Sequence, residues 1–249
     1  MSERLSTKLV ELVFMARVAE QAERSEDMVK YISEAVKMRD KDLSNEERTL
    51  LSIGFKMLVG QRRTAIRTIQ AIAPNPKYLH FAGGLTAYKK SLEEEMFAAC
   101  KQLIEIVRDH ALPRSGTPES KAFFLKMIAD YYRYISEAAE GDLLQEAKTQ
   151  AEKYYAQTDE VVNELSPWNP IRLGLALNFS VFYYEVMDDA KRACEIAEAA
   201  YELTSNLKAR EGEHDLNAAT MKDAMQIRDL IKENLQVWSR TEEEQKEES

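Results

Sequence analysis

The sequence is poor in the residues that interrupt helices or cross-link chains. Among 249 residues there are 8 glycines, 6 prolines and 2 cysteines. Such a chain spends few residues on turns, and its many Ala, Glu, Lys, Leu and Met residues favour helices. We therefore predict a nearly all-α protein, long enough to bury a substantial core.

Long apolar runs are also missing. The most apolar stretch, LGLALNFSVFYYEVM, is shorter than the roughly 20 residues that a membrane-spanning helix needs. The N-terminus is charged throughout and lacks the features of a signal peptide. Cys100 and Cys194 fit no metal-ligand spacing. We therefore interpret them as small, reduced core residues. We expect no membrane span and a cytoplasmic location, with the nucleus open as a second one.

Basic charge is in deficit, because 43 acidic residues face 34 basic ones, for a net charge of -9. This balance argues against a nucleic-acid partner, since phosphate backbones require a basic face. His80, His110 and His214 stand far apart, and no nucleophile, metal or glycine-rich phosphate motif accompanies them. We therefore expect a protein that is not an enzyme, with no catalytic residue, metal or cofactor.

Most of the local signals that remain mark the ends of helices. Ser44 and Glu47 have the spacing of a capping box at the start of a periodic run that ends at Pro74. Helix starts are also predicted at Thr117–Pro118, at Asp142 with Gln145 after a closing Gly141, and at Asn169–Pro170. These signals predict about nine helices joined by short loops.

Two segments depart from the helical pattern. Residues 74–84, PNPKYLHFAGG, hold two prolines and two glycines and predict an irregular loop. The last residues, TEEEQKEES, contain five glutamates and no apolar residue. We expect one helical domain over 1–238 and a disordered acidic tail over 239–249. We also expect this tail to compete weakly with negatively charged ligands for a cationic site on the helical domain.

Cations recur on one side of the predicted helix that begins after Ser44. Arg63 follows Lys56 by seven residues and Arg67 follows by four more, so all three share a stripe, whereas Arg62 points away. A solvated helix face is the simplest reading of this stripe alone.

A second polar stripe lies in LKMIADYYRY, among aromatic and apolar neighbours. Lys126, Asp130 and Arg133 share a face there, with Tyr134 adjacent. A buried arginine needs an anion, so either Asp130 supplies it or the stripe binds a ligand.

Two predicted apolar helices each contain a single asparagine among their apolar residues. Asn178 lies in IRLGLALNFSVFYYE, with Glu185 seven residues later, and Asn234 shares a stripe with Ile227, Leu230 and Trp238. An asparagine offers a donor and an acceptor, which suit either another helix or a peptide backbone.

From about residue 11 to Trp238 the chain resembles the 14-3-3 family. The matching segments are AEQAER, LSNEERTLLSIGFK, DYYRYISEAAEGD and PIRLGLALNFSVFYYE. The resemblance implies nine antiparallel helices that form a cup with an amphipathic groove and pair into a dimer. It also implies an adaptor that docks phosphoserine or phosphothreonine segments of client proteins, with an arginine upstream of the phosphate.

The resemblance assigns roles to the polar stripes. The phosphate pocket comprises Lys56, Arg63, Arg133 and Tyr134. The peptide-binding residues are Arg67, Lys126, Leu177, Asn178, Val181, Glu185, Ile227, Leu230, Asn234, Val237 and Trp238. Arg228 and Asp229 depart from the family pattern, and ligand preference beyond the phosphate is expected to differ.

A homodimer is expected from the same resemblance. Its interface places Val18, Ala22 and Arg24 of one copy against Ala65, Ile69, Tyr88 and Glu95 of the other, with an ion pair between Arg24 and Glu95. Ser25 and Ser91 replace family residues that strengthen this contact, and Asp27 loses its basic partner, so a weaker dimer is expected.

A phosphate-independent helical-repeat scaffold is the alternative. The segment NFSVFYYEVMDDAKRACEIAEAAYE has the small and aromatic spacing of a helix pair in such repeats. No fixed period recurs along the chain, which favours the adaptor.

Overall fold

The computed structural model describes the backbone of residues 3–206 and 217–247, and the side chains of 6–206 and 217–239. Over these ranges the chain forms nine α-helices and no strand, which confirms the all-α prediction. The helices are α1 (Glu3–Gln21), α2 (Ser25–Met38), α3 (Asn45–Ile72), α4 (Ala82–Ile106), α5 (Pro118–Ser136), α6 (Gly141–Val162), α7 (Pro170–Glu185), α8 (Ala190–Asn206) and α9 (Ala218–Glu247). Within the described residues no helix is both long and apolar enough to cross a membrane.

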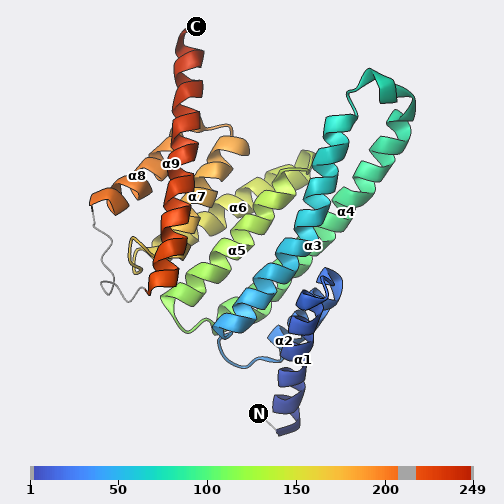
Figure 1. Ribbon diagram of the computed structural model, residues 1–249, viewed down its shortest axis with the longest axis vertical. Coiled ribbons are helices and arrows are strands. Elements are labelled where there is room, and N and C mark those ends of the chain that lie inside the picture. The colour runs from blue at the N-terminus through green and yellow to red at the C-terminus, as the bar shows by residue number, and fades with distance from the viewer. Residues whose placement is uncertain (1–2, 207–216, 248–249) are drawn as a thin grey trace. The chain divides into compact units, whose positions relative to one another are not determined.

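The helices are divided between two compact units, Met1–Gly116 and Thr117–Ser249. In the N-terminal unit, α3 and α4 lie side by side and are joined at one end by the short helix η1 (Pro76–Phe81) (Figure 1). Helices α1 and α2 pack on each other and on α3. Helix α4 runs into a π-helical turn, η2 (Val107–Ala111), and then a 3-10 turn, η3 (Leu112–Arg114).

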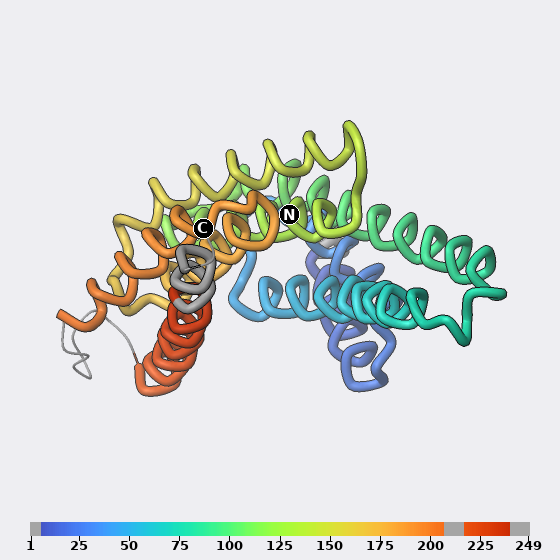
Figure 2. The backbone as a smooth tube through the Cα atoms, turned by 90° about the horizontal axis from the view of Figure 1, so that it is seen from above, coloured from blue at the N-terminus to red at the C-terminus, as the bar shows by residue number. Residues whose placement is uncertain are grey.

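The C-terminal unit is built from paired helices around two apolar clusters. Helices α5 and α6 form one extensive contact, and α7, α8 and α9 pack on one another (Figure 2). The first cluster is centred on Tyr155, Phe179 and Phe182. The second cluster contains both tryptophans, Trp168 and Trp238, with small residues of α8.

Three predicted helix starts are confirmed by the capping contacts. The Glu47 amide donates to Ser44 Oγ at 3.3 Å, and the Ser44 amide donates to Glu47 Oε2 at 2.9 Å, which completes the capping box. Thr117 accepts from the Ser120 amide at 3.1 Å before α5, and Asn169 accepts from the Ile171 amide at 2.8 Å before α7. Each cap satisfies an amide that the first helical turn leaves without a partner.

The predicted start of α6 is wrong in detail. Helix α5 ends at Ser136, so Gly141 does not close it, and Gly141 is instead the first residue of α6. Glu140 precedes the helix without a side-chain cap, and Asp142 lies inside the first turn. Gly141 has φ of 59°, a left-handed value that glycine adopts without steric cost.

The segment predicted as an irregular loop is largely helical. Asn75 accepts from the Lys77 amide at 3.0 Å and caps η1, which has Pro76 in its first turn. Gly83 and Gly84 then lie in the first turn of α4. Pro74 lies in the turn after α3, as expected of a residue that ends a helix, whereas Pro76 begins η1, where a missing amide hydrogen costs little.

Helix α9 extends through Glu247, whereas a disordered tail was predicted from residue 239. Glu, Gln and Lys are good helix formers, and adding a turn to an existing helix avoids the cost of nucleation. The side chains of 240–249 lie outside the described residues, and so does the competition predicted for this tail.

Candidate functional site

A buried carboxylate, Asp130, organises the polar face of α5. Its side chain accepts three hydrogen bonds from three helices. Lys126 Nζ of α5 donates at 2.7 Å, Tyr155 Oη of α6 donates at 2.6 Å, and Asn178 Nδ2 of α7 donates at 2.8 Å. Because Asp130 is only 8% exposed, these donors replace the water that its charge would otherwise require.

Arg133 is bonded to the same cluster from the other side. Its Nε donates to Tyr155 Oη at 3.2 Å, and its Nη1 donates to Glu137 Oε1 at 3.0 Å. The guanidinium also lies 4.7 Å from the ring centre of Tyr134. The sequence left open whether Asp130 or a ligand supplies the anion for Arg133. Asp130 pairs with Lys126, Glu137 pairs with Arg133, and Tyr155 links Asp130 to Arg133.

The cluster keeps Asp130 and Arg133 ionised despite burial. Burial alone would raise the pKa of Asp130, but the charges of Lys126 and Arg133 lower it overall. Burial alone would lower the pKa of Arg133, but Tyr155 and Asp130 raise it overall. Burial and the adjacent Asp130 raise the pKa of Tyr155, so its hydroxyl stays protonated and able to donate. The network therefore fixes a positive charge at Arg133 in a set orientation.

The cations of α3 are held differently. Lys56 and Arg67 are exposed, and Arg63 is half-buried. Arg62 extends in another direction, as the helical spacing predicted, because it pairs with Glu26 of α2 and Glu95 of α4 at 3.2 Å each.

The side chains assigned to the apolar side of the peptide groove differ widely in exposure. Leu230 and Val237 are 48% and 59% exposed on α9. Trp238 is 4% exposed and stacks on Tyr184 at 4.7 Å between ring centres, so it is a core residue of this unit. The remaining residues of this set are Leu177, Val181 and Ile227, which are half-buried at the edge of the second apolar cluster.

The polar groove residues are also spread over the C-terminal unit. Asn234 is half-buried on α9, and Glu185 is exposed at the end of α7. Arg228, one of the departures from the family pattern, donates to Thr204 Oγ1 at 3.1 Å and to Ser205 Oγ at 2.7 Å. Asp229 beside it is exposed. Arg228 therefore joins α9 to α8.

The residues assigned to the dimer interface lie on the N-terminal unit. Val18, Ala22 and Tyr88 are exposed there, Ala65 is half-buried, and Ile69 is 7% exposed. Ile69 therefore belongs mainly to the core of its own unit.

The two members of the expected intersubunit ion pair both have partners within the chain. Arg24 pairs with Asp27 at 2.8 Å, and Glu95 pairs with Arg62. Because Arg24 and Glu95 are both exposed, these contacts are weak and exchangeable.

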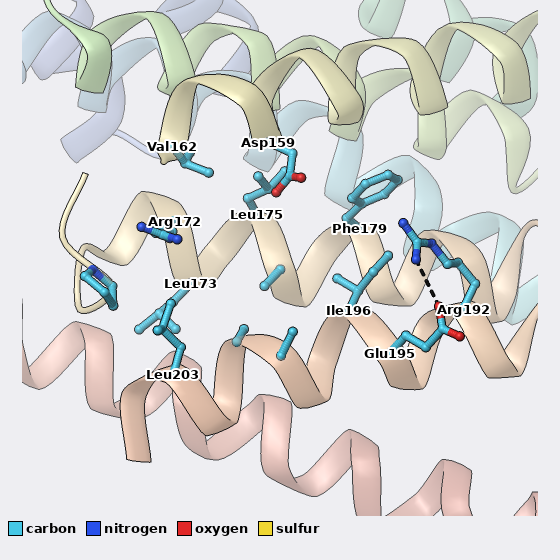
Figure 3. Close-up of a pocket in the computed structure, with 14 residues that line it drawn as sticks. Asp159, Val162, Arg172, Leu173, Leu175, Phe179, Arg192, Glu195, Ile196 and Leu203 are labelled. Carbon is cyan, nitrogen blue, oxygen red and sulfur yellow. Dashed lines mark hydrogen bonds and ion pairs between the residues drawn. The ribbon is translucent and has the colours of Figure 1, made fainter. Parts of the chain in front are cut away.

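A separate cleft, which was not predicted from the sequence, opens between α6, α7 and α8 (Figure 3). It has a volume of about 270 Å³, and Leu173, Phe179 and Ile196 line it. Arg172 and Arg192 lie at its two ends, and Arg192 donates to Glu195 at 2.9 Å (Figure 3). Burial lowers the pKa of Arg172, whose guanidinium donates to the Leu165 carbonyl at 2.8 Å. The arginines here are thus occupied by protein oxygens.

Tyr155 and Glu137 are central to the α5 network, although the sequence did not point to them. Tyr155 lies on the apolar face of α6, where an aromatic residue reads as core, and only the fold brings its hydroxyl between Asp130 and Arg133. Glu137 follows Arg133 by four residues, a helical ion-pair spacing that the sequence did contain.

The nine helices of the described ranges define an all-α protein, and the buried ionic network on α5 is the main polar feature of its C-terminal unit. The family model described as 14-3-3 protein matches residues 15–239. The chain is 41% identical over 245 residues to 14-3-3 protein beta/alpha of Xenopus tropicalis, covering 96% of each chain. It is 38% identical to 14-3-3 protein 7 of Solanum lycopersicum, covering 93% of this chain and 91% of the relative.

A relative from yeast is named for its role. The checkpoint signal transducer rad25 of Schizosaccharomyces pombe is 39% identical, over 91% of this chain and 83% of that protein. The chain belongs to the 14-3-3 family, and this membership supports a regulatory adaptor role.

Proposed function

We propose that the protein binds client proteins at phosphoserine or phosphothreonine and thereby regulates them. The observation that carries this proposal is Arg133, a buried guanidinium that is kept charged and oriented by Tyr155 and Glu137. A fixed guanidinium matches the oxygens of a phosphate and loses little entropy on binding.

In this proposal the phosphate site takes its cations from the residues that the family resemblance assigns to it. Arg133 and Tyr134 come from α5, while Lys56 and Arg63 come from α3, on which Arg67 adds positive charge. Each charge-assisted hydrogen bond contributes about 1.5–3 kcal/mol, so several of them make binding depend on the phosphate. A neutral serine offers no negative charge to these cations, which explains why a kinase would switch binding on.

The rest of the ligand is an extended peptide in this proposal. Asn178 and Asn234 hydrogen-bond its main chain, and Lys126 adds positive charge beside them. Glu185 meets an arginine that precedes the phosphorylated residue. The apolar contacts come from Leu177, Val181, Ile227, Leu230 and Val237, and the buried Trp238 supports them from the core. Main-chain hydrogen bonds are largely independent of side chains, so one site can serve many clients.

We further propose that the protein works in the cytoplasm as a homodimer, with two sites that can hold two phosphorylated segments. The exposure of Val18, Ala22 and Tyr88 supports this. Two linked sites raise the avidity for a doubly phosphorylated client without any new contact.

Fluorescence anisotropy tests the phosphate site. A labelled peptide with phosphoserine and an arginine three residues before it is compared with the same peptide carrying serine. We expect saturable binding of the phosphopeptide alone, and a loss of at least about tenfold in affinity for Lys56→Glu.

Lys90→Glu is the matched control, because it also reverses an exposed lysine of the N-terminal unit. It should leave the affinity unchanged. Equal affinity for the two peptides would overturn the proposal in favour of a phosphate-independent scaffold.

A further inference from the structure

The cleft between α6, α7 and α8 contains a cation that its own neighbours do not neutralise. At one end of the cleft Arg192 pairs with Glu195 at 2.9 Å, so its charge is balanced. At the other end the Arg172 guanidinium donates to two neutral acceptors, the Leu165 carbonyl at 2.8 Å and Asn163 Oδ1 at 3.3 Å. A guanidinium carries more N–H donors than these two acceptors use, so Arg172 can still bind an anion.

An acid lies near Arg172 without pairing with it. Asp159 of α6 lines the same cleft and points toward it (Figure 3). Burial lowers the pKa of Arg172, and the negative charge of Asp159 offsets this only in part. The Asp159 carboxylate makes no hydrogen bond or ion pair with another residue that the structure describes. The cleft therefore presents a cation and an anion that are close together but separated, and each can take a partner of opposite charge.

Apolar side chains of α7 and α8 form the remaining wall of the cleft. Leu173 and Phe179 are buried, and Ile196 is half-buried beside them (Figure 3). The volume of about 270 Å³ has room for about nine water molecules, at about 30 Å³ each. Transfer of an apolar group of this size from water to such a wall is favourable. The wall and the two charges together fit a small ligand with an apolar body and both a negative and a positive end.

We propose that this cleft binds a free apolar amino acid of about the size of leucine. Its carboxylate binds Arg172, and its ammonium group binds Asp159. Its side chain lies against Leu173, Phe179 and Ile196. A zwitterion suits the cleft because a plain carboxylate would be repelled by Asp159 and a plain amine by Arg172. The site shares no residue with the groove assigned to the phosphopeptide, so it goes beyond the proposed function and does not depend on it.

Saturation-transfer NMR of the full chain with L-leucine tests the site. Wild type should bind leucine saturably, with a dissociation constant of about 1 mM or below. Arg172→Gln and Asp159→Asn should each raise that constant at least about tenfold, because each removes a charge-assisted contact. Glu160→Gln is the matched control, since it neutralises the next acid of α6, which is exposed and does not line the cleft. It should leave the constant unchanged.

Matched ligands keep the test independent of how well the variants fold. Leucinamide lacks the carboxylate, and 4-methylpentanoate lacks the ammonium group, so wild type should bind both at least about tenfold more weakly than leucine. Cooperative urea unfolding of the variants would show that their weaker binding does not come from a loss of structure. No saturable binding of leucine up to about 10 mM, equal binding of 4-methylpentanoate, or an unchanged constant in both variants would each overturn the proposal.

Discussion

The α3 stripe and the α5 network hold their cations in opposite ways. Lys56 is exposed on α3, whereas Arg133 on α5 is 7% exposed and bonded to Tyr155 and Glu137. An exposed lysine keeps its hydration and its rotamers until a ligand arrives, while the buried arginine gives them up on folding. Substitution of Lys56 should therefore change ligand binding alone, and substitutions in the α5 network should change stability as well.

Asp130→Ala should have the largest effect. It removes the acceptor of Lys126, Tyr155 and Asn178, and it leaves buried donors without partners. Breaking a buried ion pair in this way costs about 3–5 kcal/mol, which urea unfolding would measure as a lower midpoint.

Glu160→Ala is the control for this experiment, since it removes an exposed carboxylate from α6. Its free energy of unfolding should stay within about 0.5 kcal/mol of wild type. Equal stability of the two variants would show that the network does not support the fold.

Neighbouring arginines on α3 give the next largest contrast. Arg63→Gln should weaken phosphopeptide binding by about 1.5–3 kcal/mol, because it removes a charge-assisted contact with the phosphate. Arg62→Gln should leave the affinity unchanged and cost at most about 1 kcal/mol of stability, since Arg62 pairs with Glu26 and Glu95 near the surface. Anisotropy titrations of both variants decide this, and similar affinities would contradict the assignment of Arg63.

The two asparagines give a smaller contrast. Asn178 donates to the buried Asp130, whereas the side chain of Asn234 makes no hydrogen bond to another described residue. Asn178→Ala should lower stability by about 1–2 kcal/mol and weaken binding, while Asn234→Ala should weaken binding alone. Thermal unfolding and peptide titration of each variant separate the two effects. A stability loss in Asn234→Ala as large as in Asn178→Ala would remove the distinction.

Acid should produce the smallest effect, because protonation leaves the Asp130 side chain in place. Its pKa is lower in the folded than in the unfolded chain, where aspartate titrates near about 3.9. The contribution of Asp130 is therefore complete above about pH 4 and falls as the pH drops through the folded-state value. Urea unfolding at several pH values should show a smaller loss in Asp130→Asn than in wild type, because other carboxylates such as Glu46 and Asp109, whose pKa is also lowered, still titrate in the variant.

Helix starts could be predicted from the sequence where a single residue caps the helix through a local hydrogen bond. Ser44, Thr117 and Asn169 cap the helices that the sequence assigned to them, since a cap needs only neighbours within three residues. The prediction was wrong for residues 74–84, because Pro76 does not interrupt a helix but begins η1.

The polar network was predictable only in part. Helical spacing placed Lys126, Asp130 and Arg133 on one face, but it does not decide which acid pairs with which base. That choice depends on Tyr155, which comes from α6 and separates Asp130 from Arg133. Trp238 shows the same limit, since its place in the core depends on the stacking of Tyr184.

Ligand-induced stabilisation tests the central claim most directly. The free energy of unfolding is measured for wild type and Lys56→Glu, each with the phosphoserine peptide and with its unphosphorylated form. At a free phosphopeptide concentration about 100 times the dissociation constant, wild type should gain about 2.7 kcal/mol. Lys56→Glu should begin from the same stability and gain far less. An equal gain with the unphosphorylated peptide, or an equal gain in Lys56→Glu, would contradict a phosphate site that includes α3.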